Sequence, residues 1–492
     1  MNKQIYPFYF DHYDDDFIVV NLVGEHVFLS HNDFEFLVTQ QYNKLSSAAI
    51  EKLYTHHIIG DIEEQDIVEM LLATKLRSRK NFLDYFTSLH MVVLTLRCNC
   101  VCDYCHASSQ DLCLRETDMS IEVAERTLDI ILQSPSNDIK IEFQGGEPSI
   151  NWPILEFFVL EGEKRAKKLP EKRVTFVICT NLIALSDEQI KFLNEHDVCI
   201  STSCDGPKKL HDLHRKSRDG KSAHDCFIKT LEKVRNVFRE NEVNALLTVS
   251  RDNLTNLKEV INYYIQQGFS SIFIRALNPY GYAIKNKESL GYSVDEFVDN
   301  YKNALKYIIE LNKNGIFFSE SYATLLFQRI MTPFSTGFVD LQSPAGAGIS
   351  GVIYYYNGDV YPADEARMLA TMGNTYFKMG NVCQNTYADI FKSDIIKDIV
   401  LNSCVESMPG CDSCAYSPYC GADPVRNYVE SGSILGKRYE SLFCEKNKKM
   451  IKVILDLIKE NDPETMAVLW SWVFHKPMEA WQCGRQKGLL EI

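Results

Sequence analysis

The stretch Met91–Ser108, MVVLTLRCNCVCDYCHAS, decides the fold and the chemistry expected of this chain of 492 residues. It opens as a short apolar run with two consecutive valines, which is typical of a buried strand. A loop follows that places Cys98, Cys102 and Cys105 at C-x3-C-x2-C spacing. Soft thiolate ligands favour Fe–S clusters, zinc or copper. Three protein ligands leave one metal position open, which is typical of a reactive centre.

A structural zinc loop is the alternative interpretation of the same stretch. His106 or the intervening Cys100 would then complete the ligand set. Spacing alone leaves both interpretations open.

Composition excludes several classes of protein. The formal net charge of −14 argues against a broad nucleic-acid-binding surface. No apolar run reaches the roughly 18 residues that a membrane span needs, and the N-terminus lacks an apolar secretory core. We therefore expect a cytoplasmic protein with no membrane segment. In a reducing compartment, 16 cysteines are metal ligands or buried thiols more often than disulfides.

A strand followed by a helix recurs from residue 91 to about residue 280. This alternation predicts a parallel sheet with right-handed crossovers. Six units are too few for a closed eight-stranded barrel, so the expected fold class is α/β with a partial (β/α)6 barrel. The predicted strands are Met91–Arg97, Ile139–Phe143, Val174–Cys179, Val198–Ser203, Val243–Val249 and Ser271–Leu277. The predicted helices are Ser120–Gln133, Pro153–Lys168, Ser186–His196, Asp225–Glu240 and Asn256–Gln267.

Polar and glycine-rich loops follow these strands. The second strand leads into Gln144–Pro148, the third into Thr180 and Asn181, and the fourth into Ser203–Pro207, while the sixth carries Arg275. Each loop alone is explained as a turn or a helix cap. Because the carboxyl ends of parallel strands meet at one edge, the loops together predict a shared ligand site.

Here the sequence resembles the radical S-adenosylmethionine (radical SAM) enzymes. The three-cysteine loop, with Tyr104 before its last cysteine, matches their cluster loop. The resemblance implies a 4Fe–4S cluster on Cys98, Cys102 and Cys105, with SAM on the fourth iron. It further implies reductive cleavage of SAM to a 5′-deoxyadenosyl radical that abstracts a substrate hydrogen. Cys100 lies off the family spacing and is expected not to be a ligand.

The same resemblance implies the residues that bind SAM. Gly145-Gly146-Glu147-Pro148 matches the family element that holds the methionine amino group, with Glu147 as an acceptor for the ammonium. Leu182 stands where many relatives have glycine, so its side chain occupies a place of close backbone approach. The remaining expected contacts are Thr180, Asn181, Ser203, Asp205 and Arg215.

Residues 344–444 resemble the SPASM extension, which is found in maturases of peptides and of sulfatases. Tyr354–Pro362 predicts its hairpin, with an Asn-Gly turn. The resemblance implies a second, auxiliary 4Fe–4S cluster, and a zinc ribbon is the alternative. Its ligands would be Cys411, Cys414, Cys420 and Cys444.

Relatives usually carry the ligands of one more auxiliary cluster. Those places here hold Pro344–Gly346, Ala363 and Pro424. All ligands of that cluster are absent together, which predicts two 4Fe–4S clusters per chain, one catalytic and one auxiliary. Asp364, beside the vacated position, is the expected catalytic proton acceptor, and a structural ion pair formed by the neighbouring Glu365 and Arg367 is the alternative.

The longer pattern most closely resembles maturases of His-Xaa-Ser peptide systems, over roughly residues 90–445. This resemblance implies a ribosomally made precursor peptide as substrate, of the kind rich in His-Xaa-Ser repeats. It also implies a reductant such as flavodoxin or ferredoxin and a second radical SAM enzyme as partners. A sulfatase-type maturase that oxidises serine or cysteine is one alternative, and a catalytically idle Fe–S scaffold for a partner maturase is another.

Four domains are expected. They are an N-terminal α+β module at 1–88, the barrel at 89–315, the SPASM-like domain at 316–445 and a helical tail at 446–492. The first resembles modules that dock leader peptides, and a helical cap on the barrel is the alternative. Its predicted strands are Phe17–Leu22 and Glu25–Leu29, and its predicted helices are Asp33–Gln41, Ser46–Tyr54 and Gln65–Thr74.

Overall fold

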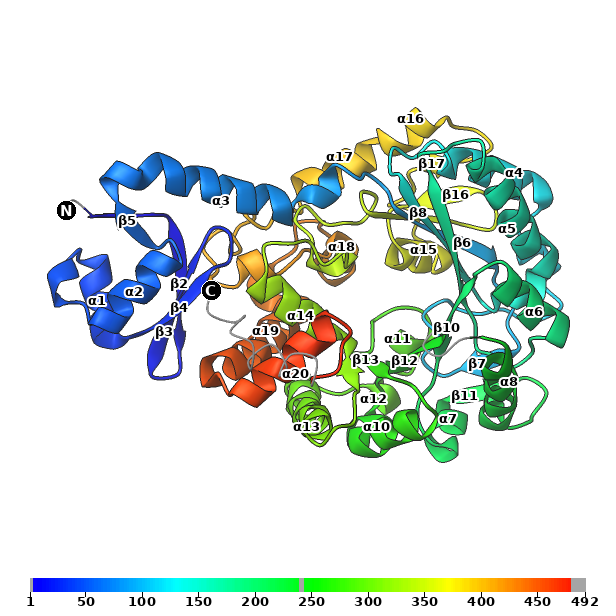
Figure 1. The fold of residues 1–492 in the computed structure, drawn as a ribbon. Coiled ribbons are helices and arrows are strands. Elements are labelled where there is room, and N and C mark those ends of the chain that lie inside the picture. The colour runs from blue at the N-terminus through cyan, green and yellow to red at the C-terminus, as the bar shows by residue number, and fades with distance from the viewer. Residues whose placement is uncertain (1–2, 239–242, 479–492) are drawn as a thin grey trace. The chain divides into compact units, whose positions relative to one another are not determined.

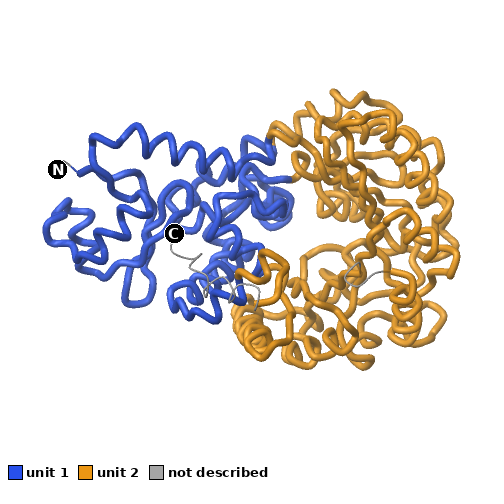
Figure 2. Tube along the Cα trace, in the orientation of Figure 1, with its two compact units in different colours: residues 1–83, 323–346, 399–469 blue, residues 84–322, 347–398, 470–492 orange. Residues whose placement is uncertain are grey.

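The computed structural model describes residues 3–238 and 243–478, shown as a ribbon in Figure 1. The predicted end of one helix at 239–240, the end of the tail and Cys483 lie outside the described residues. The chain divides into two compact units, distinguished by colour in Figure 2. Unit 1 comprises residues 1–83, 323–346 and 399–469, and unit 2 comprises the remainder. The predicted division into four consecutive domains stays a prediction.

A single large sheet is the centre of unit 2. Within the described residues its ten strands lie in the order β14-β13-β12-β10-β9-β8-β6-β15-β16-β17. The six predicted strands are neighbours in this sheet and all pair in parallel, which confirms the α/β class. They are β6 Leu89–Thr95, β8 Asp138–Gly145, β9 Arg173–Cys179, β10 Cys199–Ser203, β12 Val243–Thr248 and β13 Ser271–Arg275.

Two short strands that the sequence did not predict extend the sheet in parallel. β15 (Gly351–Tyr354) pairs with β6, and β14 (Ser319–Glu320) pairs with β13. β15 forms the predicted hairpin with β16 (Asp359–Tyr361), and Gly358 in its turn has φ +85°. The segment after residue 346 therefore completes the sheet that carries the cysteine loop. The other strands of unit 2 are β7 Cys100–Cys102, β11 Arg215–Ser217 and β17 Gly380–Asn381.

Helices connect and cover the parallel strands. Ser120 caps α4 by accepting from the Val123 N–H, and Ser186 forms a capping box with Gln189 at the start of α6. The crossover helices are α4 Ile121–Ile131, α5 Trp152–Ala166, α6 Asp187–Glu195, α7 Lys208–His214, α8 Ala223–Val237, α9 Arg251–Leu254 and α10 Leu257–Gln266. The later helices are α11 Tyr282–Lys285, α12 Lys287–Leu290, α13 Val294–Lys313, α15 Asp364–Thr371, α16 Tyr387–Phe391 and α17 Asp394–Leu401.

Unit 1 collects three separate segments of the chain. Its meander β2-β3-β4 packs on α1 and α2 through a core that includes Val19, Val27, Leu37 and Leu53. Its N-terminal elements are β1 Lys3–Ile5, β2 Phe8–Tyr13, β3 Asp16–Asn21, β4 His26–Ser30, β5 Ile59–Asp61, α1 His31–Val38, α2 Ser47–Thr55 and α3 Gln65–Arg79. The later helices, two of which cross a unit boundary, are α14 Ser321–Met331, α18 Pro424–Ser431, α19 Leu442–Glu460 and α20 Pro463–Val473.

The segments of unit 1 are joined by polar contacts to backbone carbonyls. The buried Arg79 donates to the Pro418 carbonyl at 3.1 Å and to the Thr332 carbonyl at 3.2 Å. The Tyr419 hydroxyl donates to the Gly24 carbonyl at 2.8 Å. The N-terminal module therefore belongs to the same compact unit as the region that carries Cys411, Cys414 and Cys420.

The stability of the protein is expected to depend on pH through the carboxylate of Glu25. Burial opposes its ionisation, but hydrogen bonds from His57, Lys75 and Asn21 outweigh that effect and lower its pKa to about 2. A carboxylate with a depressed folded pKa stabilises the protein above its ordinary pKa, and this contribution is lost as the pH falls. We expect the wild type to lose about 2 kcal/mol more than Glu25→Gln between pH 6 and pH 3.

Urea unfolding of the two proteins across this pH range, followed by circular dichroism, measures the difference. Glu51→Gln on the exposed face of α2 is the control and should follow the wild type. Parallel acid slopes for the wild type and Glu25→Gln would contradict the prediction.

Across the described ranges, we find no helix with the length and apolar character that a membrane crossing requires.

Candidate active site

The three-cysteine loop follows β6 and is held by hydrogen bonds from distant segments. The Asp103 N–H donates to the His214 carbonyl, and the Tyr282 N–H donates to the Cys105 carbonyl, each at 2.9 Å. Within the loop, β7 pairs antiparallel with β11, which sets Cys102 opposite Arg215. The backbone of unit 2 therefore fixes where the cysteines point.

Two glycines press against this loop. A Cβ on Gly146 would lie 2.3 Å from the Arg97 carbonyl oxygen, and one on Gly281 would lie 2.4 Å from the Cys105 carbonyl oxygen. Both neighbours are backbone atoms, which cannot yield as a side chain can. The Gly-Gly turn after β8 therefore serves close packing between that strand end and the cysteine loop.

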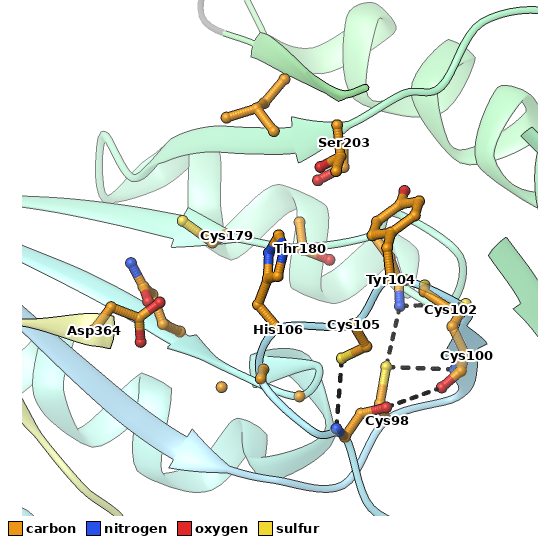
Figure 3. A pocket seen from close by; sticks show the side chains of 18 of the residues that line it. Cys98, Cys100, Cys102, Tyr104, Cys105, His106, Cys179, Thr180, Ser203 and Asp364 are labelled. Atoms are coloured by element: carbon orange, nitrogen blue, oxygen red, sulfur yellow. Dashed lines mark hydrogen bonds between the residues drawn. The ribbon is translucent and has the colours of Figure 1, made fainter. Parts of the chain in front are cut away.

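A cavity of about 330 Å³ opens above these strand ends, and Figure 3 shows it from close by. In that view the cluster cysteines lie at one end, Cys179 and Asp364 lie at the other, and His106 lies between them. Of the residues predicted for the site, those that line the cavity are Cys98, Cys102, Cys105, Gly145, Gly146, Thr180, Asn181, Ser203, Arg215 and Asp364. Their roles as ligands stay predictions.

Glu147 contacts the neighbouring loops, and its expected role as an acceptor for the methionine ammonium stays a prediction. It is buried and outside the cavity lining, and its carboxylate accepts from neighbouring loops. Oε1 accepts from the Thr180 hydroxyl at 2.8 Å and the Ser149 hydroxyl at 2.7 Å, and Oε2 accepts from the Asn181 N–H at 2.8 Å. The side chain thus ties the end of β8 to the end of β9, and in this geometry it positions the site from behind. Pro148 is likewise buried outside the lining.

Asp205 is also buried behind the cavity. The Tyr104 hydroxyl donates to its Oδ2, and Arg215 Nε lies 3.4 Å from the same oxygen. Arg215 Nε donates to the Tyr104 oxygen at 2.7 Å. Burial raises the pKa of Asp205, and the Arg215 guanidinium opposes the rise. This triad joins the cysteine loop to β11 and to the end of β10.

Asn181 reaches the cysteine loop directly. Its Nδ2 donates to the Asn99 Oδ1 at 2.6 Å and lies 3.8 Å from the sulfurs of both Cys98 and Cys100. Leu182, next in the chain, has φ +58° and a fully buried side chain. The left-handed backbone explains why glycine suits this position in relatives, and leucine occupies it here by turning its side chain into the core.

Asp364 lines the far end of the cavity and forms an ion pair with Arg367, whose guanidinium also donates to the Ala107 carbonyl at 3.4 Å. Arg275 lies 3.6 Å from Glu365 in a second ion pair. Arg367 thus pairs with Asp364 itself, whereas Glu365 pairs with Arg275, and Asp364 still lines the cavity.

Among the other lining residues, Glu142 and Cys179 were not predicted for the site, and His106 was named only as a ligand of the zinc alternative. Glu142 on β8 accepts from the Cys179 thiol on β9 at 3.4 Å, and burial together with Glu142 and Asp364 raises the pKa of that thiol. His106 lines the same cavity, and burial lowers its pKa to about 3. The alternation of side chains along a strand could have predicted Glu142 and Cys179, since every second residue of a strand lies on the same face.

A second group of cysteines lies in unit 1. Burial and the nearby thiols of Cys411, Cys414 and Cys444 raise the pKa of Cys420 to about 12. Burial raises the pKa of the Cys411 thiol to about 11, and the Arg438 guanidinium opposes that rise. The thiols of Cys411, Cys414 and Cys444 thus lie near enough to Cys420 to affect its pKa. Among the described residues, no group of three or more His, Cys, Asp or Glu side chains is arranged to hold a metal ion, so their role as cluster ligands stays a prediction.

The donor types in both groups suit the Fe–S chemistry that the motifs imply. In unit 2, three thiols line a cavity with room for a further ligand. In unit 1, the buried guanidinium groups of Arg438 and Arg329 each leave Nε without a hydrogen-bond partner among the described residues. Arg438 lies beside Cys411, and Arg329 lies close enough to Cys420 for that thiol to influence its pKa. A cluster bound by four thiolates is anionic and would compensate these buried cations.

Comparison with known proteins identifies the class. The sequence profile of the Radical SAM superfamily matches residues 92–264, from within β6 to within α10. The three-cysteine loop, the Gly-Gly-Glu-Pro element, the parallel sheet and the cavity all fall in unit 2, which contains this region. Residues 92–264 therefore form a radical SAM domain.

The chain is also similar to individual proteins of known activity or known structure. The chain is 26% identical over 309 residues to a cysteine-type anaerobic sulfatase-maturating enzyme of Clostridium perfringens, covering 60% of this chain and 78% of the relative. Its fold is similar to that of anSMEcpe with bound AdoMet, with a TM-score of 0.62, 20% identity, and 79% of this chain and 99% of the other covered. The structure of Streptococcus suis SuiB bound to precursor peptide SuiA gives a TM-score of 0.52 at 15% identity, covering 90% and 100%.

Proposed function

We propose that this radical SAM enzyme is a peptide maturase. It cleaves S-adenosylmethionine reductively to a 5′-deoxyadenosyl radical and removes a hydrogen atom from a ribosomally made precursor peptide. The observation that carries this proposal is the single cavity that joins Cys98, Cys102 and Cys105 to the ends of β8, β9 and β10. When bound, the 4Fe–4S cluster supplies the electron for SAM cleavage.

The protein's own residues have defined parts in this proposal. Cys98, Cys102 and Cys105 hold the cluster, and the Gly145-Gly146 turn lets the end of β8 lie against the loop that carries them. Thr180, Asn181, Ser203 and Arg215 are the polar groups available to bind SAM, with additional hydrogen-bonding capacity in the cavity from Gln144. The buried Glu147 and Asp205 hold these groups in place from behind.

Asp364 is proposed as the proton acceptor. It lies in the same cavity as the cysteines, and its pairing with Arg367 keeps one end of the carboxylate in a defined position. When a substrate-centred radical is oxidised, a proton must leave, and Asp364 is placed to receive it. In this proposal the auxiliary cluster on Cys411, Cys414, Cys420 and Cys444 is the second Fe–S centre.

Known relatives support a peptide substrate. Among the structural neighbours, SuiB was solved bound to precursor peptide SuiA, and anSMEcpe was solved with AdoMet and the Cp18Cys peptide. The resemblance to His-Xaa-Ser maturases favours a precursor peptide with such repeats, reduction by flavodoxin or ferredoxin, and a second radical SAM enzyme as partner. The enzyme is proposed to act in the cytoplasm.

Sulfatase maturation is the second candidate function. The observation that favours it is the sequence identity to cysteine-type anaerobic sulfatase-maturating enzymes, which extends over 309 residues. Such an enzyme oxidises a cysteine or serine side chain, so the two candidates differ in the peptide that stimulates turnover. Incubation with a sulfatase-derived cysteine peptide, followed by mass spectrometry for the aldehyde, separates them.

The decisive experiment for the radical chemistry is anaerobic. We expect the protein reconstituted with iron and sulfide to form 5′-deoxyadenosine from SAM under a strong reductant, measured by chromatography. The variant Cys98→Ala/Cys102→Ala/Cys105→Ala should form none, because no ligand for the catalytic cluster remains. Absence of 5′-deoxyadenosine from wild-type protein with a full complement of iron would contradict the proposed function.

A further inference from the structure

Glu142 is a carboxylate directed into the cavity by strand alternation. On β8 the side chains of Ile139, Ile141 and Phe143 are buried on one face of the sheet. Glu142 and Gln144 therefore share the opposite face, and both line the cavity together with Cys179 on the neighbouring β9. The acidic side chain thus forms part of the wall that a bound substrate would meet.

The hydrogen bonds of Glu142 leave half of the carboxylate unused. Oε1 accepts from the Gln144 amide at 2.5 Å and from the Cys179 thiol at 3.4 Å. Within residues 3–238 and 243–478 no donor is bonded to Oε2. Both partners are uncharged, so they orient the carboxylate without neutralising it.

The nearby cations are paired with other carboxylates. Arg367 pairs with Asp364, and Arg275 lies 3.6 Å from Glu365. Among the described residues no lysine, arginine or histidine lies within ion-pair distance of Glu142. A carboxylate in a partly enclosed cavity without a cation is costly, and a cationic ligand would remove that cost.

A second acceptor in the same cavity points to the same kind of ligand. The Nε2 atom of His106 is buried and has no hydrogen-bond partner in the described parts of the chain. His106 and Glu142 both line the cavity, and Figure 3 shows His106 projecting between the cluster cysteines and Cys179. A ligand group rich in N–H donors would satisfy both side chains.

We propose that Glu142 is a specificity-determining residue that binds a cationic side chain of the peptide at or beside the residue to be modified. The chemical class is an ammonium, guanidinium or imidazolium group, which Glu142 Oε2 would accept as a charge-assisted hydrogen bond. This inference rests on the proposed function and adds the chemistry of the substrate. The cation is carried by the peptide, whereas SAM is held by the groups around the cysteines.

The test measures binding to the reconstituted protein with SAM present. The probes are synthetic pentapeptides Ala-Ala-Xaa-Ala-Ala, in which Xaa is lysine, arginine, histidine, glutamine or leucine. By anaerobic calorimetry we expect at least one cationic peptide to bind about tenfold or more tightly than the glutamine and leucine peptides. In Glu142→Gln, which keeps an acceptor for Gln144 and Cys179, this advantage should fall below about twofold.

Two further variants sharpen the result. Glu142→Asp keeps the charge and should retain part of the preference. Asp138→Asn removes the same charge from the exposed opposite end of β8 and should retain all of it. Equal binding of all peptides by the wild type, or binding of none, overturns the inference, as does a loss of the preference in Asp138→Asn. An equal weakening of SAM binding in Glu142→Gln also overturns it, because the charge would then serve SAM.

Failure of this inference is distinguishable from failure of the proposed function. If the wild type forms 5′-deoxyadenosine but shows no preference for charge, only the role of Glu142 is wrong. If the wild type forms none while carrying its iron, the proposed function itself is wrong.

Discussion

Replacing Arg215 with methionine is expected to lower the free energy of unfolding by about 3–5 kcal/mol at pH 7. Arg215 and Asp205 are both buried, and Arg215 Nε also donates to the Tyr104 hydroxyl oxygen at 2.7 Å. Methionine fills similar volume but leaves the Asp205 carboxylate with no cation. Denaturant unfolding under anaerobic conditions measures the loss.

The pH dependence follows from the same geometry. Without the guanidinium, burial remains the largest influence on Asp205 and raises its folded pKa, opposed only by the Tyr104 hydrogen bond and by His214. The variant therefore keeps its full stability only below the unfolded pKa, and its deficit grows as the pH rises through the folded pKa. Adding Asp205→Asn to Arg215→Met should recover much of the loss at pH 7.

A surface pair supplies the matched control. Arg173→Met breaks the pair of Arg173 with Asp138, in which both side chains are mostly exposed. Such pairs contribute about 0–1 kcal/mol. If Arg215→Met and Arg173→Met were equally stable, the buried triad would have no special part in holding the cysteine loop.

The second large effect concerns iron. Exchanging Cys411 and Cys414 for alanine should lower the iron content from about eight to about four atoms per chain, since one of two 4Fe–4S clusters loses half its ligands. Iron and sulfide analysis, with Mössbauer spectroscopy, measures the change. The triple variant of Cys98, Cys102 and Cys105 should lose the other half.

Cys404→Ala is the control for this experiment. It removes a thiol from the same unit whose sulfur contacts the Val400 carbonyl at 3.4 Å, and it should retain about eight iron atoms. About four iron atoms and one zinc in the wild type would instead establish the zinc ribbon, and would contradict the auxiliary cluster.

The parallel strands were predictable because their signal is local. Each predicted strand is a run of apolar residues between turn signals, and the strands at those runs are β6, β8, β9, β10, β12 and β13. β15 and β14 were missed because each is four residues or fewer and is defined by pairing with a strand far away in the chain. Local propensity carries little information on such partners.

The sequence predicted which residues surround the site better than it predicted the direction in which their side chains point. The motifs selected the strand ends that surround one cavity, because chain order places them at one edge of the sheet. A motif does not say which way a side chain turns. Glu147 and Asp205 turn inward to buried partners, whereas Glu142, a residue without a motif, faces the cavity by strand parity.

The hydrogen bonds around the cysteine loop have a consequence for metal loading. Asp103, Cys105 and the paired strand Cys100–Cys102 are tied to His214, Tyr282 and β11 by backbone contacts that involve no metal. The conformational entropy of gathering three thiols is therefore lost when the chain folds, not when iron arrives. An assembly scaffold that delivers a cluster would therefore have little of the loop backbone left to order, and the same backbone contacts would hold the loop after a cluster is lost to oxygen.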